Sequence, residues 1–213
     1  LQQGFELYSE VYKQVSPPGD RARDTDHGAG ADLPPDQGAE AATRLVVEWL
    51  REPDERPFFL FVNYFDAHLP YRPLPSVQGR VGLSPGHHEV TIGQAERVIA
   101  EQRDLPAEER TAMRNLYLAE VSYVDDHVGR LLTALDEAGK LDETLLIVTS
   151  DHGELLGEHR MTGHEFALHE ELLHVPLLAR YPREIPAGTV VDAPVTPMDV
   201  VPTVLHLLDL EIP

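Results

Sequence analysis

The stretch LLIVTSDHG, residues 145–153, decides the fold class more than any other part of the chain. It is a short apolar run of strand type that ends in Asp151, His152 and a glycine that turns the backbone. In open α/β sheets, ligands bind beyond the carboxyl ends of the strands. A carboxylate beside an imidazole at that point offers an oxygen and a nitrogen ligand to a divalent ion, although an Asp there also serves as a turn residue or a helix cap.

Predicted strands and helices alternate around this stretch. Further strands are expected over 58–63 and 175–181, and the first is continuously apolar, as in a strand buried on both faces of a parallel sheet. Apolar residues at helical spacing predict helices over 36–50, 111–138 and 199–208. This order indicates an α/β fold with a mostly parallel sheet flanked by helices.

The length of the chain bounds its organisation. At 213 residues it is long enough for one sizeable core, and it contains no internal repeat. We therefore predict a single domain over residues 1–213. Two loop-rich excursions interrupt it at 16–38 and 70–110, where prolines and glycines are frequent.

Composition excludes several kinds of site and partner. There are no cysteines, so the chain has no disulfide, thiolate metal site or cysteine nucleophile. The net charge is −20, which makes nucleic acid and anionic membranes poor partners. No apolar run approaches the length of a membrane span. The sequence does not determine the cellular compartment.

A second polar segment follows the predicted strand 58–63. Asp66 and His68 end that strand as Asp151 and His152 end theirs, so we expect both pairs at one edge of the sheet. Asp66 is either a partner of His68 or a turn residue. Several histidines near a strand-end Asp favour a metal or anion site over a plain surface loop. The histidines that follow the strand predicted over 145–150 are at 152, 159, 164, 169 and 174.

Four segments carry a family resemblance. FFLFVNYFDAHLPY (58–71), SDHGELLGEH (150–159), LHVPLLARYP (173–182) and PVTPMDVVPTVLHLL (194–208) occur in the order found in sulfatases. The match extends from Arg44 to Pro213. The chain therefore resembles the sulfatase family, which implies an alkaline-phosphatase-like fold.

The resemblance implies roles for four residues. Asp151 and His152 match ligands of a divalent cation, with calcium as the first choice and manganese, iron or zinc as alternatives that a histidine ligand favours. His68 matches the histidine that contacts the sulfate group; the alternative is a histidine that caps the turn before Pro70. His164 stands where many sulfatases carry a sulfate-binding lysine, which leaves the substrate class and the pH optimum open.

The nucleophile of the family is missing from these 213 residues. Sulfatases use a formylglycine made within a Cys/Ser-x-Pro-x-Arg motif, and neither SPPGD (16–20) nor SVQGR (76–80) fits it. The paired aspartates of the family's first strand are absent as well. We expect an N-terminally incomplete catalytic domain, with the nucleophile and half of the metal site upstream of Leu1. Such a chain would be inactive alone and would self-associate through an exposed sheet edge.

Three functions follow from these observations. The first is a metal-dependent hydrolase of sulfuric esters, acting on a small-molecule or glycan sulfate ester. The second is a phosphonate or phosphodiester hydrolase, or a phosphoglycerol transferase, of the same superfamily. The third is a truncated, non-catalytic protein that keeps the fold as a binding or structural unit.

Overall fold

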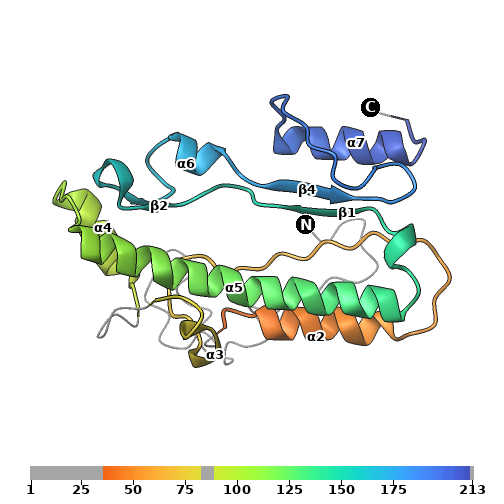
Figure 1. Cartoon of the computed structure of the whole chain (residues 1–213), viewed down its shortest axis with the longest axis horizontal. Coiled ribbons are helices and arrows are strands. Elements are labelled where there is room, and N and C mark those ends of the chain that lie inside the picture. Colours follow the sequence, from red (N-terminus) through yellow and green to blue (C-terminus); the bar gives the residue numbers. More distant parts are fainter. Residues whose placement is uncertain (1–35, 83–88, 212–213) are drawn as a thin grey trace, which may run out of the picture. The chain divides into compact units, whose positions relative to one another are not determined.

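The computed structural model describes residues 36–82 and 89–211 (Figure 1). The chain forms two compact units, one of Leu1–Ala134 with Leu156–Gly163, the other of Leu135–Leu155 with His164–Pro213. Most of the loop predicted over 16–38 lies outside the described residues. The first unit holds α2 (Ala39–Leu50), α3 (Pro75–Gln78), α4 (Ile92–Ala100), most of α5 (Ala107–Glu137) and β3 (Thr162–Gly163). The second holds β1 (Leu146–Thr149), α6 (Glu170–Leu173), β4 (Leu177–Arg180) and α7 (Val200–Leu207). The chain passes between the units within α5, within β2 (Leu155–Leu156) and after β3.

The long helix α5 organises the first unit. The helix predicted over 111–138 is confirmed and begins earlier, at Ala107. Its apolar residues Met113 and Leu116 pack with Tyr71, Val98 and Leu105 in one buried cluster. Burial of this apolar stripe, more than intrinsic propensity, stabilises a helix of such length.

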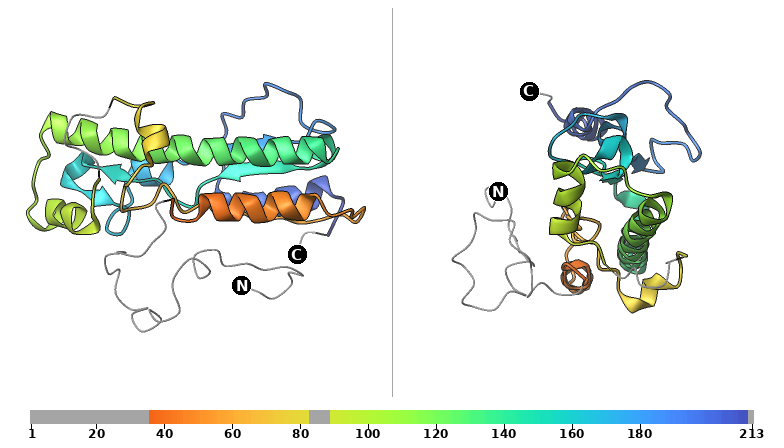
Figure 2. Two further views of the ribbon diagram at one scale, coloured as in Figure 1. Left: turned by 90° about the horizontal axis from the view of Figure 1, so that it is seen from below. Right: turned by 90° about the vertical axis from the view of Figure 1, so that its left-hand side faces the viewer.

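A buried polar seam joins α2 to α5, which run side by side (Figures 1 and 2). The ring of His127, 2% exposed, contacts the Thr43 hydroxyl through Nδ1 at 2.9 Å. Thr43 is also 2.8 Å from the hydroxyl of Tyr64. Burial, reinforced by the charge of Arg130, lowers the pKa of His127, so the ring is held neutral. The neutral hydrogen bond between Thr43 and His127 and the ion pair between Glu40 and Arg130 together hold α2 against α5.

The excursion predicted over 70–110 contains regular structure. Tyr71 and Val90 form an isolated antiparallel bridge, and α4 begins at a reciprocal cap. The Thr91 hydroxyl accepts the N–H of Gln94 at 3.3 Å, while the N–H of Thr91 donates to Oε1 of Gln94 at 2.8 Å. This is the capping box, a signal that is legible in the sequence.

The second unit contains a two-stranded ladder. β1 and β4 lie where strands are predicted over 145–150 and 175–181, and α7 confirms the helix predicted at 199–208. The ladder is antiparallel, with Leu146 opposite Arg180 and Thr149 opposite Leu177. The α/β class is confirmed, whereas the mostly parallel sheet is not. An apolar run indicates burial but not strand direction, which explains the difference.

The segment 58–63 is not a strand, contrary to prediction. Phe59 is 70% exposed and Phe61 is 72% exposed, so the run is not buried on both faces either. A strand needs a hydrogen-bonded neighbour, and the described part of the chain pairs none with this segment. The ring of Phe58 packs against that of Trp49 in a T-shaped arrangement, with the ring centroids 5.2 Å apart.

Among the described residues, no helix combines the length and the apolar character that crossing a membrane requires.

Candidate active site

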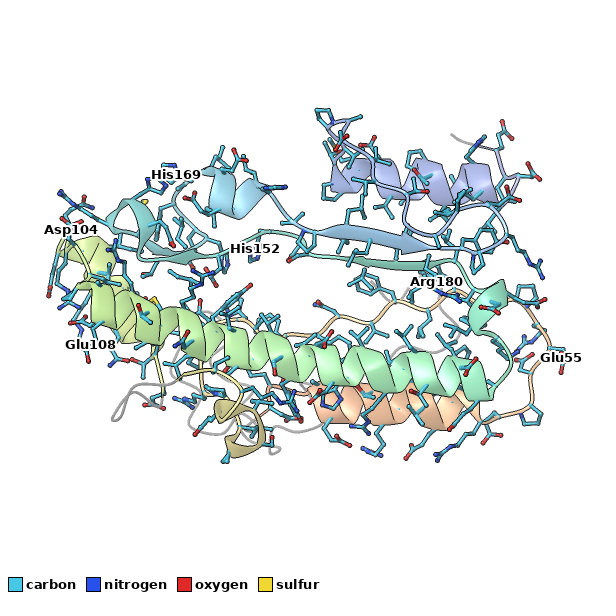
Figure 3. All side chains as sticks on the ribbon, in the orientation of Figure 1. Glu55, Asp104, Glu108, His152, His169 and Arg180 are labelled. Carbon is cyan, nitrogen blue, oxygen red and sulfur yellow. The ribbon has the colours of Figure 1, made fainter. Side chains whose placement is uncertain are left out.

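Asp151 and His152 follow the end of β1 after Ser150, at the predicted strand end. Figure 3 labels His152. The Asp151 side chain is 88% exposed, whereas that of His152 is 38% exposed. The hydroxyl of Ser150 donates to the carbonyl of His152 at 2.6 Å, and the N–H of His152 donates to Oδ1 of Asp151 at 3.1 Å. These short-range contacts fix the turn after the strand and leave the carboxylate facing solvent.

The ring of His152 is held in one tautomer. Its Nδ1 lies 2.8 Å from the carbonyl oxygen of Gly153, which can only accept, so Nδ1 carries the proton. The lone pair of the neutral ring is then on Nε2, 3.7 Å from Oδ2 of Asp151. Two ligands of one ion stand at about this separation, because each lies roughly 2.0–2.5 Å from it. The pair therefore fits a divalent cation, and the backbone contact at Nδ1 is of the kind metal-ligating histidines make.

Gly153 is required by close packing of the backbone. A Cβ built on it would lie 1.9 Å from the carbonyl oxygen of Glu171, a contact that no side chain tolerates. The N–H of Gly153 donates to the carbonyl of Leu172 at 2.8 Å. The glycine thus lets α6 lie directly against the turn that carries His152.

His164 lies beside His152, although β2 and β3 separate them in the sequence. The ring centroids are 3.9 Å apart and nearly parallel, at 26°. Nδ1 of His164 is 3.2 Å from Oε1 of Glu154, whose side chain is 6% exposed. A buried carboxylate thus holds the ring against His152. The role of Glu154 was not predicted; its position directly after the Asp-His-Gly turn is the signal for it.

His68 belongs to the first unit, so its grouping with Asp151, His152 and His164 stays a prediction. Its ring stacks on Phe65 at 4.5 Å and 17°. Nδ1 of His68 donates to the carbonyl of Leu69 at 2.7 Å, which places the lone pair of the neutral ring on Nε2. The turn is held by Gln37, whose Nε2 lies 3.2 Å from the carbonyl of Asp66, 3.0 Å from that of His68 and 3.4 Å from that of Pro70. No sequence signal indicated this role for Gln37.

Two buried carboxyl groups lie close to this turn. Burial and the charge of Asp36 raise the pKa of Asp66 to about 8. Burial likewise raises the pKa of Glu120 to about 9, with the N–H of Arg72 acting in the opposite direction. Neither side-chain oxygen of Asp66 has a hydrogen-bond partner in the described residues, so Asp66 is not the hydrogen-bonding partner of His68. Glu120 was missed, although it falls on the apolar stripe of α5, four residues after Leu116.

Two other side chains of types that can bind a metal lie at the surface. Asp126, on α5, pairs with Arg80 at 2.7 Å, and both side chains are 46% exposed. His174 is 82% exposed. Across 36–82 and 89–211, no three His, Asp or Glu side chains converge in a metal-binding arrangement. The assignment of Asp151 and His152 as metal ligands therefore stays a prediction.

Comparisons with known proteins identify relatives of the chain. The chain is 42% identical over 97 residues to an N-acetylglucosamine-6-O-sulfatase of Bacteroides thetaiotaomicron, a match covering 46% of this chain and 17% of that protein. It is 33% identical over 200 residues to mouse steryl-sulfatase, covering 87% of this chain and 27% of that protein. The structure matches a phosphonate monoester hydrolase of Silicibacter pomeroyi with a TM-score of 0.59 and 25% identity, over 98% of this chain and 45% of that one. The chain thus spans less than half the length of these proteins.

The family itself is settled by a longer match. The model of the Sulfatase family covers residues 8–210, which contain all four predicted site residues. The chain therefore belongs to the sulfatase family.

Proposed function

We propose that this chain is part of a metal-dependent hydrolase of sulfate esters, in which Asp151 and His152 hold the cation and His68 and His164 bind the sulfate group. The observation that carries the proposal is the fixed tautomer of His152, whose Nε2 lone pair lies 3.7 Å from Oδ2 of Asp151. Membership of the sulfatase family supports the reaction class. The domain proposed is a single partial catalytic domain over residues 1–213.

The donor set suggests which cation binds. Asp151 is a hard oxygen ligand suited to calcium, while the imidazole of His152 favours manganese or zinc. When bound, the cation supplies a Lewis acid that polarises an ester oxygen. Because two protein ligands give weak affinity, we propose that further ligands come from outside this chain.

The two stacked histidines have different proposed roles, His152 as a metal ligand and His164 as a sulfate-binding group. His152 keeps its proton on Nδ1 and presents a lone pair from Nε2. His164, when doubly protonated, can donate from Nε2 to a sulfate oxygen while Glu154 balances its charge at Nδ1. Two positive rings 3.9 Å apart would repel, so the neutral, metal-binding form of His152 suits a charged His164.

The nucleophile and the substrate come from outside the described site. The 213 residues contain no cysteine and no Ser-x-Pro-x-Arg segment, so we place the formylglycine on a segment beyond this chain. A sulfated glycan is the proposed substrate class, because one of the relatives is an N-acetylglucosamine-6-O-sulfatase.

Metal binding tests the first half of the proposal. The whole chain is titrated with calcium, manganese and zinc chloride by calorimetry, beside Asp151→Asn and the matched surface control Asp192→Asn. We expect Asp151→Asn to weaken binding of the preferred metal at least about tenfold and Asp192→Asn to leave it unchanged. Equal affinities in all three proteins would contradict the assignment.

Sulfate binding tests the second half. Inorganic sulfate is titrated into the chain with the preferred metal present, and we expect His164→Ala to weaken binding while the exposed control His174→Ala does not. The chain itself should not turn over 4-nitrophenyl sulfate. Robust turnover would show that the nucleophile lies within these residues, and the absence of both metal and sulfate binding would leave the non-catalytic alternative.

A phosphonate or phosphodiester hydrolase is the second candidate function. The specific observation is His164 at the position where many sulfatases carry lysine, together with the structural match to a phosphonate monoester hydrolase. The titration is repeated with methylphosphonate in place of sulfate. Affinity at least tenfold higher for methylphosphonate would favour this candidate over sulfate-ester hydrolysis.

A further inference from the structure

A small cavity in the first unit is lined by side chains to which the proposed function assigns no role. Asp36, Gln37, Asp66 and Glu120 surround it, and they come from the turn before α2, the His68 turn and α5. Asp66 is 3% exposed and Glu120 is 5% exposed. Burying two carboxyl groups at one place is costly unless their oxygens find donors or a cation.

The oxygens around this cavity do not find such partners. Both Oδ atoms of Asp66, Oε2 of Glu120 and Oε1 of Gln37 are buried and have no hydrogen-bond partner in the described part of the chain. The amide of Gln37 cannot be turned over, because its NH₂ group already faces three carbonyl oxygens. When the carboxyl groups of Asp66 and Glu120 are ionised, every atom named here accepts hydrogen bonds and none donates, so the occupant that suits this state is a donor or a cation.

The guanidinium of Arg72 also lines the cavity and acts to lower the pKa of Glu120, but its charge is shared with Glu89. Arg72 gives its backbone N–H to Oε1 of Glu120, and its Nε pairs with Oε2 of Glu89 at 3.1 Å. Tyr123 lines the cavity too, and burial raises its pKa to about 12, so it carries no charge at neutral pH. The charges that face Asp66 and Glu120 are thus Asp36, each other, and an arginine already engaged with Glu89.

The size of the cavity limits the occupant. Its volume is about 10 Å³ and it is partly open to solvent. That is the space one water molecule needs, which excludes an amine or guanidinium ligand and admits a monatomic ion. Carboxylate and amide oxygens in an irregular arrangement suit calcium better than magnesium, which demands near-ideal octahedral geometry.

We propose that Asp66, Glu120 and Gln37 form a calcium site in the first unit, distinct from the Asp151–His152 pair. The ion ties α5 to the turn before α2 and to the turn that carries His68, and so holds His68 in place. With three protein ligands and solvent completing the shell, the expected Kd is about 10⁻⁴–10⁻³ M, as in weak extracellular calcium modules.

Thermal unfolding of the whole chain with calcium chloride tests the site. The background is Asp151→Asn, which removes the other cation site, and the variants Asp66→Asn, Glu120→Gln and the exposed α5 control Asp125→Asn are added to it. At calcium about tenfold above Kd, we expect Tm to rise by about 3–6 °C in Asp151→Asn and in its combination with Asp125→Asn. We expect no rise when Asp66→Asn or Glu120→Gln is added. A rise that survives Asp66→Asn and Glu120→Gln, or no rise in the background, overturns the proposal.

Terbium luminescence gives a second readout that does not depend on stability. Terbium replaces calcium at oxygen sites and is excited through a nearby tyrosine, here Tyr123. In the same background we expect luminescence that calcium competes away and that Tyr123→Phe reduces severalfold. Unchanged luminescence in Tyr123→Phe would place the bound ion elsewhere and refute the site.

Discussion

The buried carboxyl groups predict an unusual dependence of stability on pH. In the folded chain the pKa of Asp66 is raised to about 8 and that of Glu120 to about 9, whereas exposed carboxyls titrate near 4. Between these values the folded state keeps protons that the unfolded state has lost. The stabilisation is therefore complete below about pH 4 and is lost progressively as the pH rises toward 8–9.

The magnitude follows from the retained protons. For each retained proton, the free energy of unfolding falls by about 1.4 kcal/mol per unit rise in pH. Asp66 alone therefore lowers the free energy of unfolding by about 3 kcal/mol as the pH rises from 5 to 7. Glu120 contributes a similar amount. The sum, about 6 kcal/mol, is comparable with the whole stability of an ordinary domain and is an upper value, because water entering the cavity would reduce it.

Urea unfolding with a chelator present, followed by circular dichroism from pH 5 to 8, measures this effect. We expect the slope of stability against pH to flatten in Asp66→Asn and to flatten further when Glu120→Gln is added. His127, whose pKa is lowered, gives an opposite slope near pH 6.5, but it does so equally in every variant. Parallel curves for the wild type and both variants would refute the reasoning.

Three further predictions concern packing and the histidine pair. Gly153→Ala should destabilise the second unit by about 2 kcal/mol or more in urea unfolding, because the new Cβ would clash with the Glu171 carbonyl. Its control is Gly129→Ala in α5, where a Cβ has nothing within 4 Å and should stabilise the chain by about 0.5–1 kcal/mol. Thr43→Val should lower the free energy of unfolding by about 1–3 kcal/mol in the same assay, since it leaves His127 without its hydroxyl partner. An unchanged unfolding midpoint would show that the Thr43–His127 contact does not stabilise the fold. Glu154→Gln should weaken inorganic sulfate binding severalfold in calorimetry while leaving metal affinity within about threefold, and equal losses of both would show that Glu154 merely supports the fold.

Local patterns in the sequence were sufficient for the main elements. Helical periodicity located α5, and the apolar run before Asp151 located β1, because both signals depend on neighbours only a few residues away. The exposed segment around Phe59 could not be predicted, since burial of an apolar run depends on a partner strand that the run does not encode.

The candidate sites show the same division between local and distant contacts. His152 and His164 could be grouped because they lie within one short stretch of sequence. Glu120 and Gln37 could not, because their roles arise only when α5 and the turn before α2 enclose Asp66. A lone Glu on an apolar helix stripe was the one available signal, and it points to a buried charge without naming its partner.

The hydrogen bond between Thr43 and His127 spans 84 residues, and the contact of Arg72 with Glu120 spans 48. On a ribosome that adds about 5–20 residues per second, α2 thus waits roughly 4–17 s for its partner on α5. During that interval the turn around His68 has neither Glu120 nor the helix that buries it. Nascent chains of this protein therefore pass through a stage in which Asp66, buried in the folded chain, is still solvated.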